Sequence, residues 1–244
     1  MMTDKFVDYN GIRIYYSPEL DGGGREFGQD FIPVVRERFG KVGRCCEFGA
    51  GPGFIGFSLL AEGLCEKLDL VEVNEDAVRA MEKTIKKNRL EGVAEVFLSD
   101  VLKDVDRKMD WDLVVSNPPH FEGGEDKYMR DMRVYDPGWR IHREFYRDIS
   151  RFIVKGGSSL FVENRFGSSP KLWENMINDA GLKYVGSFRH RAIGRIPRLS
   201  DFVAYVKGEK GFTKKSSLGE VIAKTALHAV YTLYYPYYFV LSKR

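Results

Sequence analysis

The order of apolar and polar positions divides the chain into short strands and amphipathic helices. Residues 6–16, FVDYNGIRIYY, contain two alternating runs on either side of Asn10-Gly11, a pair typical of a two-residue hairpin turn. A loop over 18–24 follows, and apolar side chains at helical spacing predict a helix over 27–39. The chain is therefore expected to begin with a hairpin and a helix.

From residue 44 onward the predicted strands and helices alternate. We expect strands at 44–48, 67–73, 93–98, 111–116 and 158–163, helices at 54–62, 75–88, 139–154 and 171–180, and a closing antiparallel pair at 184–190 and 202–207. The continuous apolar run of 111–116 is typical of a strand buried in a parallel sheet. This order predicts an α/β protein with a Rossmann-like, doubly wound mixed sheet and helices on both faces.

The composition supports one folded enzyme-sized unit. Of the 244 residues, 43% are hydrophobic and 30% are charged, which excludes a disordered chain. No run reaches the roughly 18 apolar residues of a transmembrane span, and the first ten residues lack the apolar stretch of a signal peptide. We therefore expect a cytoplasmic protein without a transmembrane span.

The net charge of +3 is unevenly distributed. Residues 209–244 hold six basic and two acidic residues, whereas the preceding 208 residues hold 32 basic and 33 acidic ones. We accordingly divide the chain into an N-terminal hairpin and cap helix (1–43), a core (44–208) and a basic C-terminal extension with helical and aromatic stretches (209–244). That extension is expected to pack on the core or on a partner in a homodimer; a membrane-surface anchor and a pocket wall are alternatives.

Cysteine and histidine give no sign of a metal site. The three cysteines, Cys45, Cys46 and Cys65, have neither zinc-ligand spacing nor an even count, and the four histidines are scattered. We expect the cysteines to be small buried side chains, and we assign no metal.

A glycine-rich turn follows the first core strand. Residues 45–56 read CCEFGAGPGFIG, so that Glu47 ends the strand and Gly49, Gly51 and Gly53 lead into the next helix. Glycines in such a turn let the backbone approach a ligand closely, although an ordinary strand-to-helix turn can have the same composition.

Three more polar signals stand at the ends of the following strands. Glu72 ends the second strand, Asp100 the third, and Asn117-Pro118-Pro119-His120 follows the fourth. Open α/β sheets bind ligands at the carboxyl ends of their strands, so these four motifs predict one ligand site. Taken singly, Asp100 could be a helix N-cap and Glu72 a surface acid.

This order of motifs resembles the class I S-adenosylmethionine (SAM) methyltransferases over roughly residues 18–208. The N-P-P signal is similar to the branch that methylates planar nitrogens, which includes glutamine and adenine N-methyltransferases and the small-domain enzymes acting on guanine in ribosomal RNA. Leu20-Asp21-Gly22-Gly23-Gly24 is similar to the L-D-x-G approach of that small-domain group.

The resemblance implies SAM as cofactor and a role for each motif. Gly49, Gly51 and Gly53 would pass beneath its methionine part, and Glu47 would position its amino group. Glu72 would hold the ribose hydroxyls and Asp100 the adenine amine, with Asn117 shared between the cofactor and the substrate.

The N-P-P turn suits a nitrogen nucleophile. Asn117 and the carbonyl of Pro118 can accept the two N–H groups of an amide or aryl amine, and the prolines keep these acceptors in place. The family usually has an aromatic residue at the fourth position, where this chain has His120 followed by Phe121. His120 could stack on the substrate, accept the released proton, or act only as a hydrogen-bonding loop residue.

The substrate side is predicted from the long segment 122–143. Tyr128, Tyr135 and Trp139 could wall the substrate, whereas the alternative is a solvated charged loop. A carboxylate or phosphate could be bound by Arg130, Arg133 and Arg140. The arginines of 188–198 could face phosphate or guard an exposed hairpin edge.

The leading hypothesis is SAM-dependent methylation of a planar nitrogen of a small molecule or protein. Nucleic acid is the less favoured partner because the core is nearly neutral. Transfer or cyclisation of the aminocarboxypropyl arm of SAM, an RNA base N-methyltransferase, and a non-catalytic SAM- or RNA-binding protein stay open as alternatives.

Overall fold

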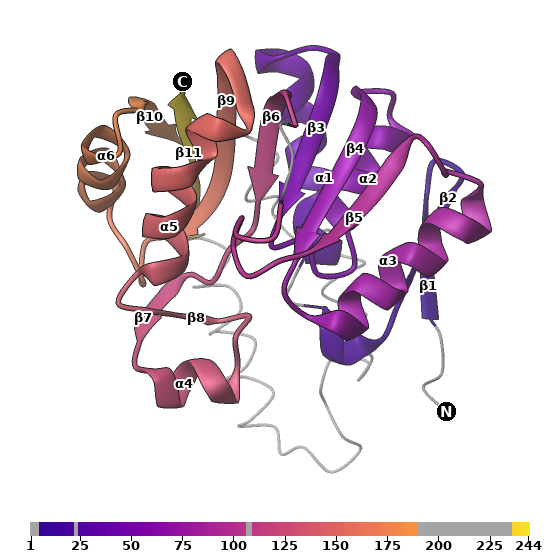
Figure 1. Cartoon of the computed structure of the whole chain (residues 1–244), viewed down its shortest axis with the longest axis horizontal. Coiled ribbons are helices and arrows are strands. Elements are labelled where there is room, and N and C mark those ends of the chain that lie inside the picture. Colours follow the sequence, from indigo (N-terminus) through magenta and orange to yellow (C-terminus); the bar gives the residue numbers. More distant parts are fainter. Residues whose placement is uncertain (1–4, 22–23, 106–108, 190–235) are drawn as a thin grey trace, which may run out of the picture.

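A seven-stranded mixed sheet forms the centre of the protein in the computed structural model, which describes residues 5–21, 24–105, 109–189 and 236–244. The strand order is β10-β11-β9-β6-β3-β4-β5. Its members are β3 (Val42–Phe48), β4 (Cys65–Glu72), β5 (Ala94–Leu98), β6 (Trp111–Ser116), β9 (Ile153–Asn164), β10 (Lys183–Phe188) and β11 (Tyr237–Lys243). Neighbours pair in parallel from β9 to β5, and β11 runs antiparallel to both β9 and β10. This confirms the predicted doubly wound architecture (Figure 1).

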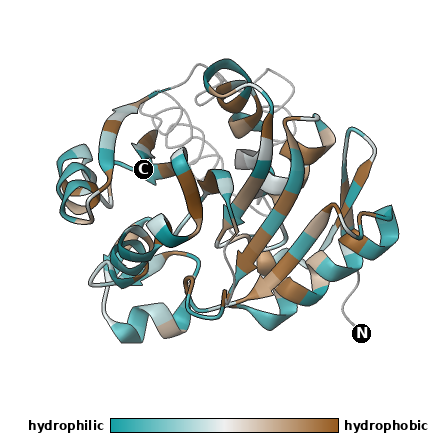
Figure 2. Cartoon of the chain, turned by 45° about the horizontal axis from the view of Figure 1, so that its top comes forward, coloured by the Kyte–Doolittle hydropathy of each residue, from teal (hydrophilic) through white to brown (hydrophobic). Residues whose placement is uncertain are grey.

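Helices cover both faces of the sheet because its inner strands are apolar on both sides. Alternate strand residues enter two different cores: Cys45 faces one and Cys46 the other, as do Val115 and Val114. The first core includes α1 (Gly24–Arg38), α2 (Phe54–Ala61) and α3 (Glu75–Asn88), and the second includes α5 (Arg140–Asp148) and α6 (Pro170–Asp179). Figure 2 shows the resulting hydrophobic strands between helices with hydrophilic outer surfaces.

The predicted hairpin is confirmed as β1 (Lys5–Tyr9) paired with β2 (Ile12–Tyr16). Asn10 and Gly11 both have positive φ, at 45° and 92°, which a two-residue turn of this twist requires. Asn88 at the end of α3 accepts a hydrogen bond from Arg13 N–H and donates one to Arg13 carbonyl. This pair holds the hairpin against α3, and a short 3-10 turn, η1 (Pro18–Leu20), then leads towards α1.

The segment after β6 departs from the predicted loop and long helix. It contains β7 (Phe121–Gly123), α4 (Glu125–Arg130) and β8 (Tyr135–Pro137), and β7 pairs in parallel with β8. Figure 1 shows these elements beyond the carboxyl ends of the central strands. The helix predicted to reach residue 154 ends with α5 and the 3-10 turn η2 (Ile149–Arg151), because Ile153 already belongs to β9.

The last residues of the predicted C-terminal extension form a core strand. β11 lies between β9 and β10, and Tyr238, Phe239 and Val240 are each at most 1% exposed. It is β11 that pairs with β10, a role the sequence assigned to 202–207. Residues 202–207 and most of the extension lie outside the described residues.

Two further expectations can be compared with the structure. All three cysteines are buried and free, as the sequence predicted. Across the described parts of the chain, no helix is long and apolar enough to cross a membrane.

Candidate functional site

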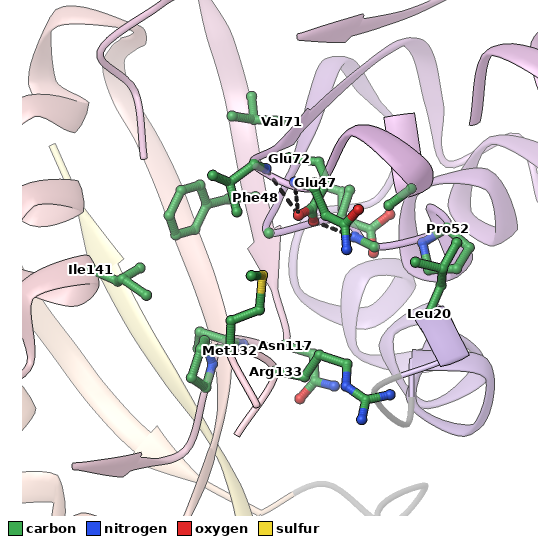
Figure 3. Close-up of a pocket in the computed structure, with 18 of the residues that line it drawn as sticks. Leu20, Glu47, Phe48, Pro52, Val71, Glu72, Asn117, Met132, Arg133 and Ile141 are labelled. Atoms are coloured by element: carbon green, nitrogen blue, oxygen red, sulfur yellow. Dashed lines mark hydrogen bonds between the residues drawn. The ribbon is translucent and has the colours of Figure 1, made fainter. Parts of the chain in front are cut away.

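A pocket opens at the carboxyl ends of β3, β4 and β6, where the sequence motifs were expected to meet (Figure 3). Four of the predicted elements line it together: the glycine turn, Glu72, Asp100 and the N-P-P turn. Its lining comprises Glu19, Leu20, Glu47, Phe48, Gly49, Ala50, Gly51, Pro52, Phe54, Ile55, Val71, Glu72, Val73, Asn74, Ala77, Ser99, Asp100, Val101, Asn117, Pro118, Pro119, Tyr128, Met132, Arg133 and Ile141. Polar groups stand among apolar walls, as in many small-molecule sites.

The glycine turn gives the pocket a floor of bare backbone. Gly49 and Gly51 have positive φ values of 61° and 51°, and a Cβ on Gly49 would meet no atom within 4 Å. Gly53 differs, because a Cβ there would lie 2.7 Å from the Phe57 ring. Gly53 is therefore required for packing at the start of α2, and it does not line the pocket with the other two.

Glu47 is a buried carboxylate that binds the first turn of α2. Its two oxygens accept hydrogen bonds from Ile55 N–H at 3.3 Å and Gly56 N–H at 2.7 Å. Burial raises the pKa of Glu47 to about 8, and the two N–H donors only partly oppose that effect. The side chain can therefore gain or lose a proton near neutral pH.

Glu72 ties the end of β4 to the glycine turn. Its Oε2 accepts a hydrogen bond from Gly51 N–H at 2.7 Å, and its Oε1 accepts from Val73 and Asn74 N–H. Burial raises the pKa of Glu72, and these backbone donors counteract it. A carboxylate has about four lone-pair sites, so the fixed group keeps capacity for a further donor from a ligand.

Asp100 is held by two cations. Arg140 Nη1 lies 3.1 Å from Asp100 Oδ2, and Lys103 Nζ lies 2.8 Å from the same oxygen. Burial alone would raise the pKa of Asp100, but these cations outweigh it and lower the pKa. Arg140, predicted on the substrate side, therefore lies beside the group predicted to bind adenine.

The N-P-P turn places an unused acceptor at the pocket. Asn117, Pro118 and Pro119 line it. Asn117 Oδ1 is buried and has no hydrogen-bond partner among the residues that the structure describes. Below the turn, Ser116 Oγ donates to the Phe48 carbonyl at 2.7 Å, which links β6 to β3. An oriented, unpaired carbonyl oxygen is suited to accept an N–H from a ligand.

His120 and Phe121 lie next to the N-P-P turn but are not part of this lining. His120 lies with its ring centroid 5.3 Å from that of Tyr237, and Phe121 pairs with Tyr135 in the small β7–β8 ladder. Neither residue lines the pocket. The structure thus places Asn117 and Pro118 at the pocket and these two predicted catalytic residues beside it.

The predicted substrate residues are also divided. Tyr128 lines the pocket, whereas Tyr135 packs near Lys127. Trp139 is 8% exposed, and its ring contacts Trp173 edge-on at 4.9 Å, so it belongs to the core. Of these aromatic side chains, only Tyr128 stands where it can touch a ligand in the pocket.

Several lining residues were not predicted. Phe48 and Ile141 form apolar walls, while Met132 extends from the segment after α4 (Figure 3). Its neighbour Arg133, which the sequence offered as a candidate for binding an anionic group, also lines the pocket. Arg133 also donates a hydrogen bond from Nη1 to the Glu19 carbonyl at 2.6 Å, which joins that segment to η1. Phe48 stands between Glu47 and Gly49, a position that could have identified it; Met132 and Ile141 carry no such signal.

The chain resembles known methyltransferases over its central part. A family model described as the methyltransferase small domain matches residues 19–183. Ribosomal RNA small subunit methyltransferase C of Haemophilus influenzae (strain PittGG) is 28% identical over 148 residues, 60% of this chain and 40% of that protein. The protein of the same name from Pasteurella multocida (strain Pm70) is 29% identical over 162 residues, 66% of this chain and 44% of that protein. The chain thus spans less than half the length of these relatives.

Solved structures share the fold at low sequence identity. The T. thermophilus 16S rRNA N2 G1207 methyltransferase (RsmC), in complex with AdoMet and guanosine, has a TM-score of 0.51 at 18% identity, covering 75% of this chain and 47% of its own. M. capricolum TrmK with S-adenosyl-homocysteine has 0.51 at 11%, covering 88% and 67%. The [4+2]-cyclase SpnF has 0.54 at 13%, covering 88% and 80%. The different activities named for these proteins show that the shared fold does not fix the reaction.

Proposed function

Because the chain belongs to the methyltransferase small domain family, we propose that it uses SAM to methylate a planar nitrogen of an RNA base, with the amino group of guanine as the first candidate. The observation that carries this proposal is Asn117 Oδ1, a buried acceptor without a partner at the pocket. An amino group conjugated to a ring supplies the N–H that such an acceptor lacks.

The pocket fits the proposed cofactor. Open space above Gly49 leaves room for the methionine part, and the fixed carboxylate of Glu72 can accept hydroxyl donors from a ribose. Asp100 stands at the third strand end to meet an amine, although Arg140 and Lys103 share it. The sulfonium of bound SAM supplies an electrophilic methyl group.

The residues of the N-P-P turn would act by orienting the substrate amine and not as acids or bases. Asn117 Oδ1 and the Pro118 carbonyl would accept the two N–H groups of the substrate amine, which aims its lone pair at the methyl group. Prolines restrict the turn, so little reorganisation is required when the substrate binds. Orientation of this kind can contribute several kcal/mol to the lowering of a reaction barrier.

RNA replaces the small molecule or protein that the sequence favoured as substrate. The relatives reported above are named as ribosomal RNA methyltransferases, which supports RNA as the substrate. That preference used the charge of the whole core, whereas base recognition depends on the groups around one pocket. Phe166 is 69% exposed just after β9, where it is available to stack on a base.

The alternative reaction on the aminocarboxypropyl arm has less support. For such a reaction, a closed box of aromatic side chains from the C-terminal extension could hold the sulfonium by cation–π contact. Tyr238, however, is 1% exposed within the core and does not line the pocket. The aromatic residues of β11 therefore do not form such a box at this pocket.

The decisive experiment measures binding and product separately. Calorimetry with SAM tests the cofactor, and incubation with SAM and either 16S ribosomal RNA, small ribosomal subunits, peptides or small amines tests the substrate. Mass spectrometry of digested RNA is expected to show a methylated guanosine together with S-adenosylhomocysteine. Methylation of peptides or amines alone contradicts the RNA proposal, and methylthioadenosine as the product contradicts methyl transfer.

A matched pair of variants ties the product to the pocket. Asn117→Ala is expected to lower turnover about 10²-fold, as when an oriented transition-state partner is removed. Asn175→Ala changes an exposed asparagine on α6 and is expected to keep wild-type turnover. Equal rates for both variants contradict the assigned role of Asn117.

A further inference from the structure

Three buried ionisable side chains lie in contact with one another close to the N-P-P turn. His142 on α5 contacts Asp136 through Nδ1 at 2.6 Å and Glu163 on β9 through Nε2 at 3.0 Å. All three side chains are at most 1% exposed. Unpaired charges at such depth are costly, so a continuous set of this kind requires a specific arrangement of protons.

The two carboxyl groups on either side of His142 determine the charge of its ring. Asp136 accepts hydrogen bonds from Ile141 and His142 N–H at the start of α5, which stabilises its carboxylate. Burial by itself lowers the pKa of His142, but Glu163 and Asp136 outweigh it and raise the pKa to about 9. His142 is therefore a cation at neutral pH, donates from both ring nitrogens, and stacks on Trp173 at 4.5 Å.

Glu163 then has one oxygen left over. Its Oε1 accepts from His142, whereas Oε2 is buried and has no hydrogen-bond partner within the described parts of the chain. His120 Nδ1 lies 3.7 Å from Glu163 Oε2, and it too is buried without a hydrogen-bond partner among the described residues. An unpaired acceptor, Glu163 Oε2, and an unpaired donor, His120 Nδ1, thus lie just beyond hydrogen-bond distance of each other.

Two further residues lie close to His120. Tyr237 of β11 packs against the ring, and a Cβ on Gly167 would collide with the His120 carbonyl. The side chain of His120 is 12% exposed. Of its two ring nitrogens, only Nδ1 is both buried and unpaired within the described structure; Nε2 is not. The two ring nitrogens therefore occupy different environments.

We infer that Glu163 is a positioning residue that binds His120 Nδ1–H and so leaves His120 Nε2 as the acceptor for the proton released from the substrate nitrogen. Asp136 and His142 hold Glu163 oriented. The inference rests on the proposed function, because the released proton is that of the methylated nitrogen. It adds residues that no motif in the sequence indicated.

The atoms balance in this step. The substrate nitrogen forms a bond to the methyl carbon, the bond from that carbon to the sulfonium sulfur breaks, and S-adenosylhomocysteine leaves neutral at sulfur. The nitrogen then loses one proton to His120 Nε2, and the imidazolium that forms is stabilised by the carboxylate of Glu163 beside Nδ1. The proton later passes to solvent.

The first test reads the histidine tautomers by ¹⁵N nuclear magnetic resonance of the full chain without RNA. His120 is expected to carry its neutral proton on Nδ1, with its signals identified by their loss in His120→Asn. In Glu163→Gln the amide oxygen must accept from cationic His142, which turns the amide NH₂ towards His120 Nδ1. The proton of His120 is therefore expected to move to Nε2. An Nε2–H tautomer in the wild type, or no change in Glu163→Gln, overturns the inference.

The second test measures single turnover on 16S ribosomal RNA. Glu163→Gln is expected to lower the rate about 10-fold and His120→Asn about 10²-fold, while SAM affinity stays within twofold, since neither residue lines the pocket. His120→Asn keeps a donor for Glu163 but has no atom at Nε2, so it tests the proton acceptor even where Glu163→Gln folds poorly. Glu62→Gln, at a surface pair with Arg36, is the matched control and should keep the wild-type rate.

The outcomes separate this inference from the proposed function. A tautomer switch with an unchanged rate, or wild-type turnover in His120→Asn, overturns the role of His120 as proton acceptor. A double variant that is slower than His120→Asn also contradicts it, because Glu163 is expected to act only through His120. Failure of the wild type to methylate any RNA overturns the proposed function, whereas the tautomer switch by itself still supports the contact between Glu163 and His120.

Discussion

The backbone N–H of Gly51 donates a hydrogen bond to Glu72 Oε2 over 2.7 Å, so the glycine turn after β3 is fastened to the end of β4. This contact joins the two features on which the cofactor site depends. It fixes the carboxylate before any ligand binds, and it fixes the bare backbone opposite that ligand. Preorganisation of this kind lowers the cost of ordering the site on binding.

Glu72→Gln is expected to weaken SAM binding roughly 10- to 100-fold. An amide has a single acceptor oxygen, so it cannot serve Gly51, the N–H groups after β4 and a ribose hydroxyl together; loss of a charged hydrogen bond costs about 1.5–3 kcal/mol. Isothermal titration calorimetry measures the change. Glu75→Gln, an exposed neighbour paired with Arg79, should bind like the wild type. A Glu72→Gln protein with wild-type affinity contradicts the ribose role.

Glu47 is expected to make stability fall as pH rises. Because burial raises its pKa to about 8 from a value near 4.5 in the unfolded chain, the folded state binds more protons than the unfolded state between these values. The free energy of unfolding therefore contains a contribution from Glu47 that is fully present below about pH 4.5 and is lost as the pH rises towards 8, by about 1 kcal/mol per pH unit.

Urea unfolding at pH 5, 6, 7 and 8 checks this contribution by difference. Glu47→Gln cannot titrate, so its free energy of unfolding should depend less steeply on pH than that of the wild type. Glu66→Gln is the control, because Lys41 lowers the pKa of this exposed acid and removes its titration from the interval. Parallel pH curves for Glu47→Gln and the wild type would show that Glu47 titrates near its ordinary pKa.

The part of the site that the sequence predicted consists of residues at strand ends. Glu47, Glu72 and Asn117 follow directly from the strand pattern, since parallel strands in one sheet bring their carboxyl ends to one edge. Trp139 was misplaced because a large aromatic in a polar segment can equally wall a ligand or fill a core. Its contact with Trp173 depends on α6, which comes about thirty residues later in the chain.

Other elements depend on contacts that no local pattern carries. His142 stands on the buried face of α5 although its side chain is polar, because Asp136 and Glu163 pair with it there. The strand Tyr237–Lys243 is inserted between β9 and β10, and this pairing joins segments far apart in the chain. Helical or strand-like periodicity predicts an element but not the partner against which a distant segment docks.

Gly167→Ala is expected to destabilise the protein by about 1–3 kcal/mol and to displace the turn that carries His120. The φ of Gly167 is not in the left-handed region, but an added Cβ would collide with the His120 carbonyl, and forced overpacking has costs of this size. Chemical unfolding measures the loss. Phe166→Ala, at the exposed neighbouring position, should change stability by no more than about 0.5 kcal/mol. A wild-type midpoint for Gly167→Ala contradicts the close approach.

Arg140→Met is expected to change cofactor binding and to leave RNA binding nearly unchanged. Arg140 Nη1 lies 3.1 Å from Asp100 Oδ2 and 3.3 Å from Glu144 Oε2. Removal of the guanidinium frees Asp100 to reorient, since Lys103 is then the one cation in contact with it among the described residues. Because Asp100 is partly exposed, screening keeps the effect small, and a two- to tenfold change in SAM affinity is expected.

Calorimetry with SAM and filter binding with 16S ribosomal RNA measure the two affinities of the Arg140→Met protein. Arg147→Met, at an exposed arginine on the same helix, is the control. A loss of RNA affinity with unchanged SAM affinity would return Arg140 to the substrate side, where the sequence had placed it.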